Sequence, residues 1–306
     1  AGACGTNTTA LRSNHVIHLD AATVLLQWAV GGMAFCWFTT RRREVSLGYG
    51  WLLRSVYGLM AVGAAVAGFR YGTVPVREAA SIGVALACLL GLAVSVRRRA
   101  AGVSGRSIEH DRRSARVAAM TGIDRSVDQQ VESERSGPEF PPILDLVPVA
   151  IGVIGLIAAA IDAAPDGGAD TVVSLLRTLS GAAFLGAISD AMLLGHWYLT
   201  QPGLPRRLLN EIVDALVWIW PIEVAVMLLP PGMIGVFTGA VDDGWGGTLG
   251  WFWAACAIAT IVLILVTKAA LREREYSAVM AATGLLYLAI LTAFGTDLVA
   301  RAVLDV

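Results

Sequence analysis

The sequence predicts an all-α, polytopic membrane protein with about eight transmembrane helices. Of its 306 residues 56% are hydrophobic and only 15% are charged, and the mean hydropathy is +0.66. A soluble chain would carry about a quarter charged residues. Several apolar runs approach the ~20 residues needed to cross a bilayer. Because the runs are continuously apolar rather than alternating, we exclude a β-barrel.

Each expected helix ends at a charged cluster or a turn signal. The first and third stop at the arginine clusters 41–43 and 97–99, and a short link from Arg70 to Pro75 follows the second. The fourth tolerates Pro148 near its start, and a Pro-Asp-Gly-Gly turn at 165–168 precedes the fifth. A Pro/Arg-rich hinge at 201–207 joins the fifth to the sixth, and Arg272–Glu275 separates the last two. The predicted spans are 21–40, 46–69, 79–96, 143–163, 171–199, 208–230, 249–270 and 276–299. The apolar run 233–241 is too short to span and is read as a re-entrant or interfacial piece.

The distribution of basic residues predicts the orientation of these helices. Of the 23 Lys and Arg residues, 17 fall in the segments on one side, four on the other and two inside helices. Since basic residues favour the cytoplasmic side, we expect both termini to be extracytoplasmic. Residues 1–20 then form an extracytoplasmic tail, and 21–306 form one membrane domain with a charged cytoplasmic loop at 97–142.

The function classes open to such a chain are few. It has no nucleophile elbow, P-loop, HExxH or Rossmann motif, and no basic groove with interleaved aromatic residues, so we expect neither an enzyme nor a nucleic-acid partner. The Ala/Gly/Val/Arg bias suggests a bacterial inner-membrane protein. We expect a non-catalytic accessory subunit of a larger membrane complex, plausibly respiratory, with loop 97–142 docking a partner subunit. The alternative is a small ion, proton or metal transporter.

Ionisable residues inside the predicted spans carry the transporter alternative. They are expensive in hydrocarbon and often functional. Asp190 continues a stripe of small residues on its helix, which places it toward the bundle. Matching depths predict two pairs, Arg54 with Asp190 and Arg177 with Glu223, that either pin helices together or tune a protonatable Asp190. Asp214 lies about one turn into the apolar layer of its helix.

Two further clusters lie near the membrane boundaries. His15, His18 and Asp20 share a spacing that could bind copper or zinc at the outer face, although Asp20 could instead cap the following helix. A bis-histidine haem within the chain is not expected, because His18 and His196 lie a membrane apart. The second cluster consists of His196, Arg206, Arg207 and Glu211. We predict that it forms a cytoplasmic mouth for protons, a quinone or an anionic headgroup. The alternative is that these residues anchor the helices at the membrane interface.

Overall fold

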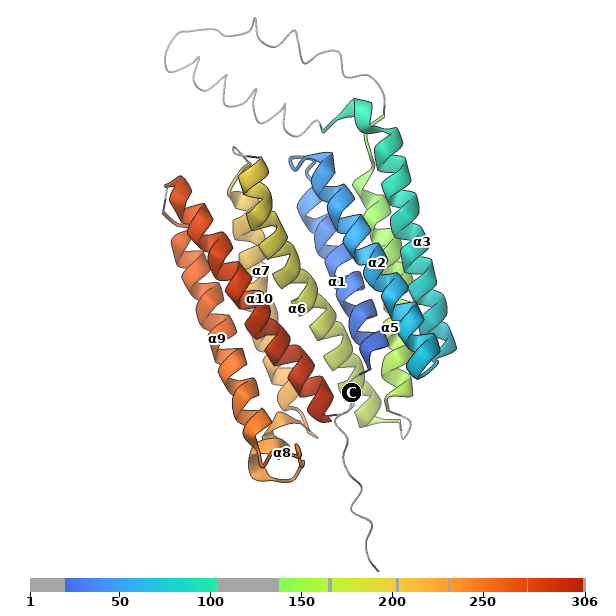
Figure 1. Cartoon of the computed structure of the whole chain (residues 1–306), viewed down its shortest axis with the longest axis vertical. Helices are drawn as coiled ribbons and strands as arrows, with labels where there is room; N and C mark the ends of the chain where they lie inside the picture. The colour runs from blue at the N-terminus through green and yellow to red at the C-terminus, as the bar shows by residue number, and fades with distance from the viewer. Residues whose placement is uncertain are drawn as a thin grey trace, which may run out of the picture.

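The structure, a computed structural model, is a bundle of long helices (Figure 1). It describes residues 20–103, 138–164, 167–201, 204–230, 232–273 and 275–304. The long helices are α1 (Ala21–Thr40), α2 (Leu47–Tyr71), α3 (Pro75–Arg97), α5 (Leu146–Asp162), α6 (Ala169–Thr200), α7 (Arg207–Leu228), α9 (Thr248–Ala270) and α10 (Tyr276–Leu304). Short pieces are η1 (Arg99–Ala101), η3 (Pro142–Asp145) and α8 (Met233–Thr238). All regular structure in these ranges is helical, which confirms the predicted class.

Within the described ranges, seven helices are long and apolar enough to cross a membrane, so the chain fits a multi-pass membrane protein. They are α1, α2, α3, the segment formed by η3 and α5, α6, α9 and α10. The helix α7 is not among them, because it carries Arg207, Glu211, Asp214 and Glu223. The structure therefore supports seven of the eight predicted membrane spans.

The long helices form two sets of four that repeat one packing order. In the first set α1 packs on α2, α2 on α3, α3 on α5, and α5 returns to α1. In the second set α6 packs on α7, α7 on α9, α9 on α10, and α10 returns to α6. The two sets meet where α6 packs on α1 and α5, at the centre of the bundle (Figure 1).

Small residues bring α1 and α6 into backbone contact at this junction. A Cβ atom on Gly31 would lie 1.7 Å from the carbonyl oxygen of Ala182, and one on Gly186 would lie 2.2 Å from the carbonyl carbon of Gly31. Glycine is therefore required at both positions for this approach. The stripe of small residues on α6 packs as the sequence predicts, and Asp190, one turn beyond Gly186, is fully buried.

The short apolar run after α7 forms only α8. This helix lies at the end of the bundle where α1 begins (Figure 1). Its residues Met233 and Val236 pack in a small core with Trp253 of α9. The piece thus covers the ends of its neighbours and does not cross the bundle.

Candidate functional site

A fully buried polar cluster lies where α1 meets α6, α7 and α10. It consists of Gln27 on α1 and of Asp297 and Arg301 on α10, gathered around Gly181 of α6, together with Glu223 on α7, which lies beside Asp297. A Cβ atom on Gly181 would lie 2.0 Å from Nε2 of Gln27, 2.6 Å from Oδ1 of Asp297 and 2.7 Å from Nη2 of Arg301. Three polar side chains therefore converge on the backbone of α6, in space that only glycine leaves open. We call this group the Gly181 cluster.

Arg301 holds one side of the Gly181 cluster in place. Its Nε donates to Oδ1 of Asp297 at 2.9 Å, one turn away on α10, and its Nη2 donates to the carbonyl oxygen of Arg177 at 2.5 Å. The guanidinium thus ties α10 to α6. It also gives Asp297 a counter-charge inside the bundle, without which a buried carboxylate would be strongly unfavourable.

Arg177 borders the cluster and binds the C-terminal end of α7. Its Nη2 donates to the carbonyl oxygen of Leu229 at 2.8 Å, and its Nε donates to that of Val226 at 3.5 Å. The Leu229 carbonyl is one that the end of a helix leaves without an intrahelical donor, whereas the Val226 carbonyl also accepts from the backbone N–H of Leu229 at 3.3 Å. Glu223 is close enough for its charge to act on Arg177. The predicted Arg177–Glu223 pair is not hydrogen-bonded, because neither carboxyl oxygen of Glu223 has a hydrogen-bond partner among the described residues, and the two groups lie only within reach of each other's charge.

Several polar atoms of the Gly181 cluster are buried without a hydrogen-bond partner among the described residues. They are both amide atoms of Gln27, both carboxyl oxygens of Glu223, Oδ2 of Asp297 and Nη1 of Arg301. The Glu223 carboxyl group lies beside Asp297 and Ser180 but makes a hydrogen bond of normal geometry to neither. Native proteins leave few such atoms unsatisfied, and each carries a desolvation cost. Two adjacent carboxyl groups repel when both are ionised, and a proton bound by one of them relieves that repulsion.

Asp190 forms a second buried carboxyl centre, and its partner differs from the Arg54 that we predicted from the sequence. Its Oδ1 accepts a hydrogen bond from the hydroxyl group of Tyr57, and its Oδ2 has no partner in the described part of the chain. Arg54 instead binds Asp145, with Nε–Oδ1 and Nη2–Oδ2 both at 2.7 Å. The predicted Arg54–Asp190 pair is therefore wrong. A bidentate carboxylate satisfies the fork of a guanidinium better than a single distant charge.

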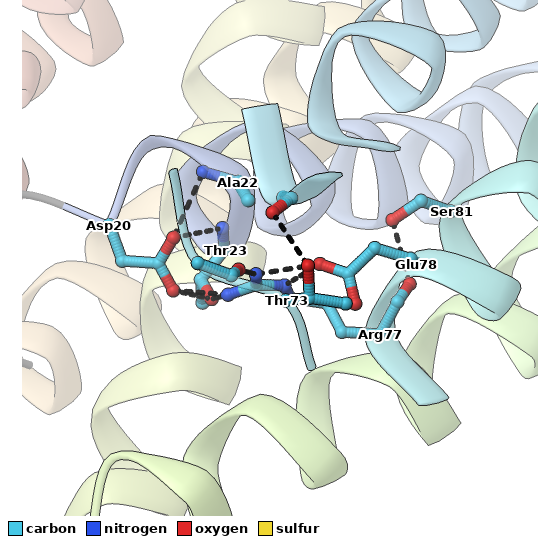
Figure 2. A network of polar contacts seen from close by, with 9 residues as sticks. Asp20, Ala22, Thr23, Thr73, Arg77, Glu78 and Ser81 are labelled. Atoms are coloured by element: carbon cyan, nitrogen blue, oxygen red, sulfur yellow. Dashed lines mark hydrogen bonds and ion pairs between the residues drawn. The ribbon is translucent and has the colours of Figure 1, made fainter. Parts of the chain in front are cut away.

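The end of the bundle where α1 begins carries a third polar network (Figure 2). Asp20 caps α1, since its Oδ1 accepts from the backbone amides of Ala22 at 3.1 Å and Thr23 at 3.3 Å. Its Oδ2 accepts from Thr23 Oγ1 at 2.6 Å and from Arg77 of α3, which also binds Glu78. The capping alternative for Asp20 is confirmed.

The copper or zinc site stays a prediction. Its other two residues, His15 and His18, lie outside the described residues. Both oxygens of Asp20 already accept hydrogen bonds, as Figure 2 shows. Within the described ranges no group of three His, Cys, Asp or Glu side chains is arranged to hold a metal ion.

The residues of the predicted cytoplasmic mouth are found at the opposite end of the bundle with separate partners. His196 Nδ1 lies 3.2 Å from the hydroxyl oxygen of Tyr287, and Arg206 donates to the carbonyl oxygens of Glu273 and Glu275. The remaining charges form ion pairs: Arg207 and Glu211 of α7 bind Glu44 and Arg42 in the loop between α1 and α2, and Asp214 of α7 binds Lys268 of α9 at 2.8 Å. These contacts anchor helix ends and bring the four predicted residues to no common point.

The Gly181 cluster is the strongest candidate site in the described residues. It supplies six of the ten buried side-chain atoms that lack a partner there, and it draws on four helices from both sets. Only Glu223 and Arg177 of its members and neighbours were singled out from the sequence. Comparison with protein-family models, curated proteins and solved structures found no match to this chain.

Proposed function

We propose that this chain is a small ion-coupled transporter in which a proton binds the carboxyl groups of Glu223 and Asp297. One observation carries the proposal: two fully buried carboxyl groups lie side by side in a helical bundle, and three of their four oxygens have no partner in the described chain. Ionisable groups at such positions are expensive in a membrane and mark proton or ion pathways.

The charges around the pair favour a proton over a metal ion. Arg301 binds Asp297, and the charge of Arg177 acts on Glu223. A bound metal cation would be repelled by both guanidinium groups at short range. A proton needs one oxygen and adds no bulk, so it suits a tightly packed site.

The arrangement of the helices supports transport as well. Two sets of four helices with one packing order resemble the parallel repeats from which some transporters are built. In such proteins the binding site lies where the repeats meet. The Gly181 cluster has this location, because Gln27 reaches it from the first set and the other side chains from the second.

In this proposal α7 is the eighth crossing and both termini are extracytoplasmic. The end of α6 and the start of α9 lie at opposite ends of the bundle (Figure 1), so the chain must traverse it along α7. The excess of basic residues on the side of loop 97–142 supports a cytoplasmic location for that side in a bacterial cell.

Infrared difference spectroscopy of the full chain in proteoliposomes tests the proton site. A pH change should produce a carboxylic-acid band, part of which disappears in Glu223→Gln and in Asp297→Asn. The matched control is Asp214→Asn, because Asp214 is half exposed and paired with Lys268 away from the cluster. A wild-type spectrum without a titrating carboxyl group, or a band that both cluster variants leave intact, refutes the proposal.

A separate observation favours the accessory-subunit function as the second candidate. Arg54 and Asp145 form a complete buried ion pair between α2 and η3, which holds helices together and leaves no site for an ion. Purification from native membranes separates the candidates. Co-migration with stoichiometric membrane partners, with loop 97–142 needed for it, supports the subunit. A chain that purifies alone and binds protons supports the transporter.

A further inference from the structure

A large cavity lies at the end of the bundle where α1 begins. It has a volume of about 620 Å³, within the range of small-molecule sites. Its wall comes from α1, the turn between α2 and α3, α5 and α6. The polar groups in the wall are those of Asp20, Thr23, Tyr71, Thr73, Arg77, Asp162 and Thr178. Part of this wall, from Asp20 to Arg77, is drawn in Figure 2.

Arg77, the basic residue among those that line the cavity, has no donor left for an anion. Its Nε and Nη2 donate to Glu78 Oε1 at 3.0 and 2.7 Å, and Nη2 also donates to the carbonyl oxygen of Gly72. Its Nη1 donates to Thr23 Oγ1 at 3.1 Å and to Asp20. These bonds use all five N–H groups of the guanidinium. A phosphate or carboxylate ligand would have to break them.

The carboxylates at the cavity outnumber this one cation. Asp162 ends α5, is exposed, and has no ion-pair partner in the part of the chain that the structure describes. Asp20 keeps 39% of its side chain exposed, although it binds Arg77. Glu78, behind Arg77, retains a buried Oε2 without a partner among the described residues. With two carboxylates in the wall, Asp20 and Asp162, against one guanidinium, the cavity attracts cations.

We propose that this cavity binds a small organic cation through a primary ammonium group. An ammonium group offers three donors around a compact charge, which suits separate carboxylate and hydroxyl acceptors. The rest of the wall includes short apolar side chains that leave room for an alkyl chain, namely Ala22, Ala67, Val74, Ala159 and Ala163. A calcium ion would need six or more oxygen ligands. Among the described residues no group of three His, Cys, Asp or Glu side chains is arranged to hold a metal ion.

The cavity site supplies a substrate for the proposed transporter. Only its coupling to protons rests on the proposed function. Thr178 of the cavity wall is adjacent on α6 to Arg177, and Thr23 lies one turn from Gln27 on α1. The cavity and the Gly181 cluster therefore share the walls formed by α1 and α6. The ammonium compound would be the substrate that moves against protons bound at Glu223 and Asp297.

Calorimetric titration of the full chain in phosphatidylcholine nanodiscs with n-butylammonium tests the site. Wild-type protein should bind n-butylammonium and should not bind n-butanol or butyrate. Asp162→Asn should weaken binding by about fivefold, the upper end for an exposed ion pair. Asp162→Glu should restore most of it. The matched control is Asp170→Asn, which removes an exposed aspartate at the same end of the bundle but outside the cavity wall.

The source of the ammonium group is decided with the same protein. If a lipid headgroup is the natural ligand, phosphatidylethanolamine in the nanodisc should compete with n-butylammonium, and phosphatidylglycerol should not. If free amines are the ligand, neither lipid should compete. Absence of n-butylammonium binding in phosphatidylcholine, or equal weakening by Asp162→Asn and Asp170→Asn, overturns the inference.

The two proposals fail in different ways. Loss of amine binding with an intact carboxyl band at Glu223 and Asp297 refutes the cavity site and leaves the proton site standing. Amine binding without that band refutes the proton site and leaves the cavity site standing. If both are present, an n-butylammonium gradient across proteoliposomes should drive protons in the opposite direction in wild type but not in Glu223→Gln. Proton movement that survives in Glu223→Gln overturns the coupling.

Discussion

Neutralising Asp145 should destabilise the protein far more than neutralising Asp190. In Asp145→Asn the guanidinium of Arg54 loses a carboxylate that meets it at 2.7 Å through two nitrogen atoms, and 3% of the Arg54 side chain is exposed to solvent. Removing one partner of a buried ion pair costs about 3–5 kcal/mol, because the other charge stays buried without compensation. The ring of Phe140, 4.2 Å from the guanidinium, offers only partial replacement.

Asp190→Asn should cost about 1 kcal/mol or less, since the asparagine carbonyl still accepts the hydrogen bond of Tyr57. The double variant Arg54→Met with Asp145→Leu should recover most of the stability lost in Asp145→Asn, because it removes both charges and keeps the volume. The free energy of unfolding is measured by titration of mixed micelles with SDS. The reasoning is refuted if Asp190→Asn costs several kcal/mol while Asp145→Asn is nearly neutral, because Arg54 would then depend on Asp190.

Three further predictions concern packing, pH and orientation. Gly31→Val should lower the free energy of unfolding by at least about 1–3 kcal/mol, because the valine side chain would overlap a backbone carbonyl of α6. The control Gly284→Ala should leave stability unchanged, because the space around its Cβ is open. Equal SDS-unfolding midpoints for the two variants would contradict this prediction. The pKa of Asp243 lies below its ordinary value, since burial raises it but backbone N–H donors, including that of Leu249, lower it more. The loop before α9 should therefore keep its order above about pH 4 and lose it as the pH falls through this lowered pKa. The measurement is the protection of the Leu249 amide against hydrogen exchange. Protection that persists at lower pH would contradict the prediction. A cysteine at Asp242, which is exposed in the same loop, should react with a membrane-impermeant reagent from outside, and one at Ser114 only after permeabilisation. The reverse pattern would overturn the orientation.

The helices are largely predictable because apolar length and basic stops decide them locally. The first predicted span, 21–40, coincides with α1, and most other ends agree within a few residues. α3 begins at Pro75, four residues before the predicted start, and so includes Arg77 and Glu78. The sequence places these two charges in a loop. In the structure Arg77 binds both Glu78 and Asp20, which makes the burial of Arg77 and Glu78 in the first turns of α3 possible.

The candidate site was harder to predict because its members are brought together by tertiary packing. In the sequence Gln27 is a single polar residue in an apolar helix. Only the packing of α1 against Gly181 of α6 brings it close to Asp297 and Arg301. Asp297 and Arg301 lie at the end of the last helix, where charges are read as interfacial. Their spacing of four residues was a usable signal, because oppositely charged residues at i and i+4 face each other on a helix. Asp145 was missed because it follows two prolines and resembles a helix boundary.

The contact of Gly31 with α6 divides the interior of the bundle. Gln27 and the Gly181 cluster lie one turn to one side of it, and Asp190 lies one turn beyond Gly186 on the other. Backbone atoms of α1 and α6 touch at this level, so no file of water molecules passes along their shared face. If Glu223 or Asp297 takes up a proton as proposed, α1 and α6 would have to separate for that proton to reach Asp190 along this face.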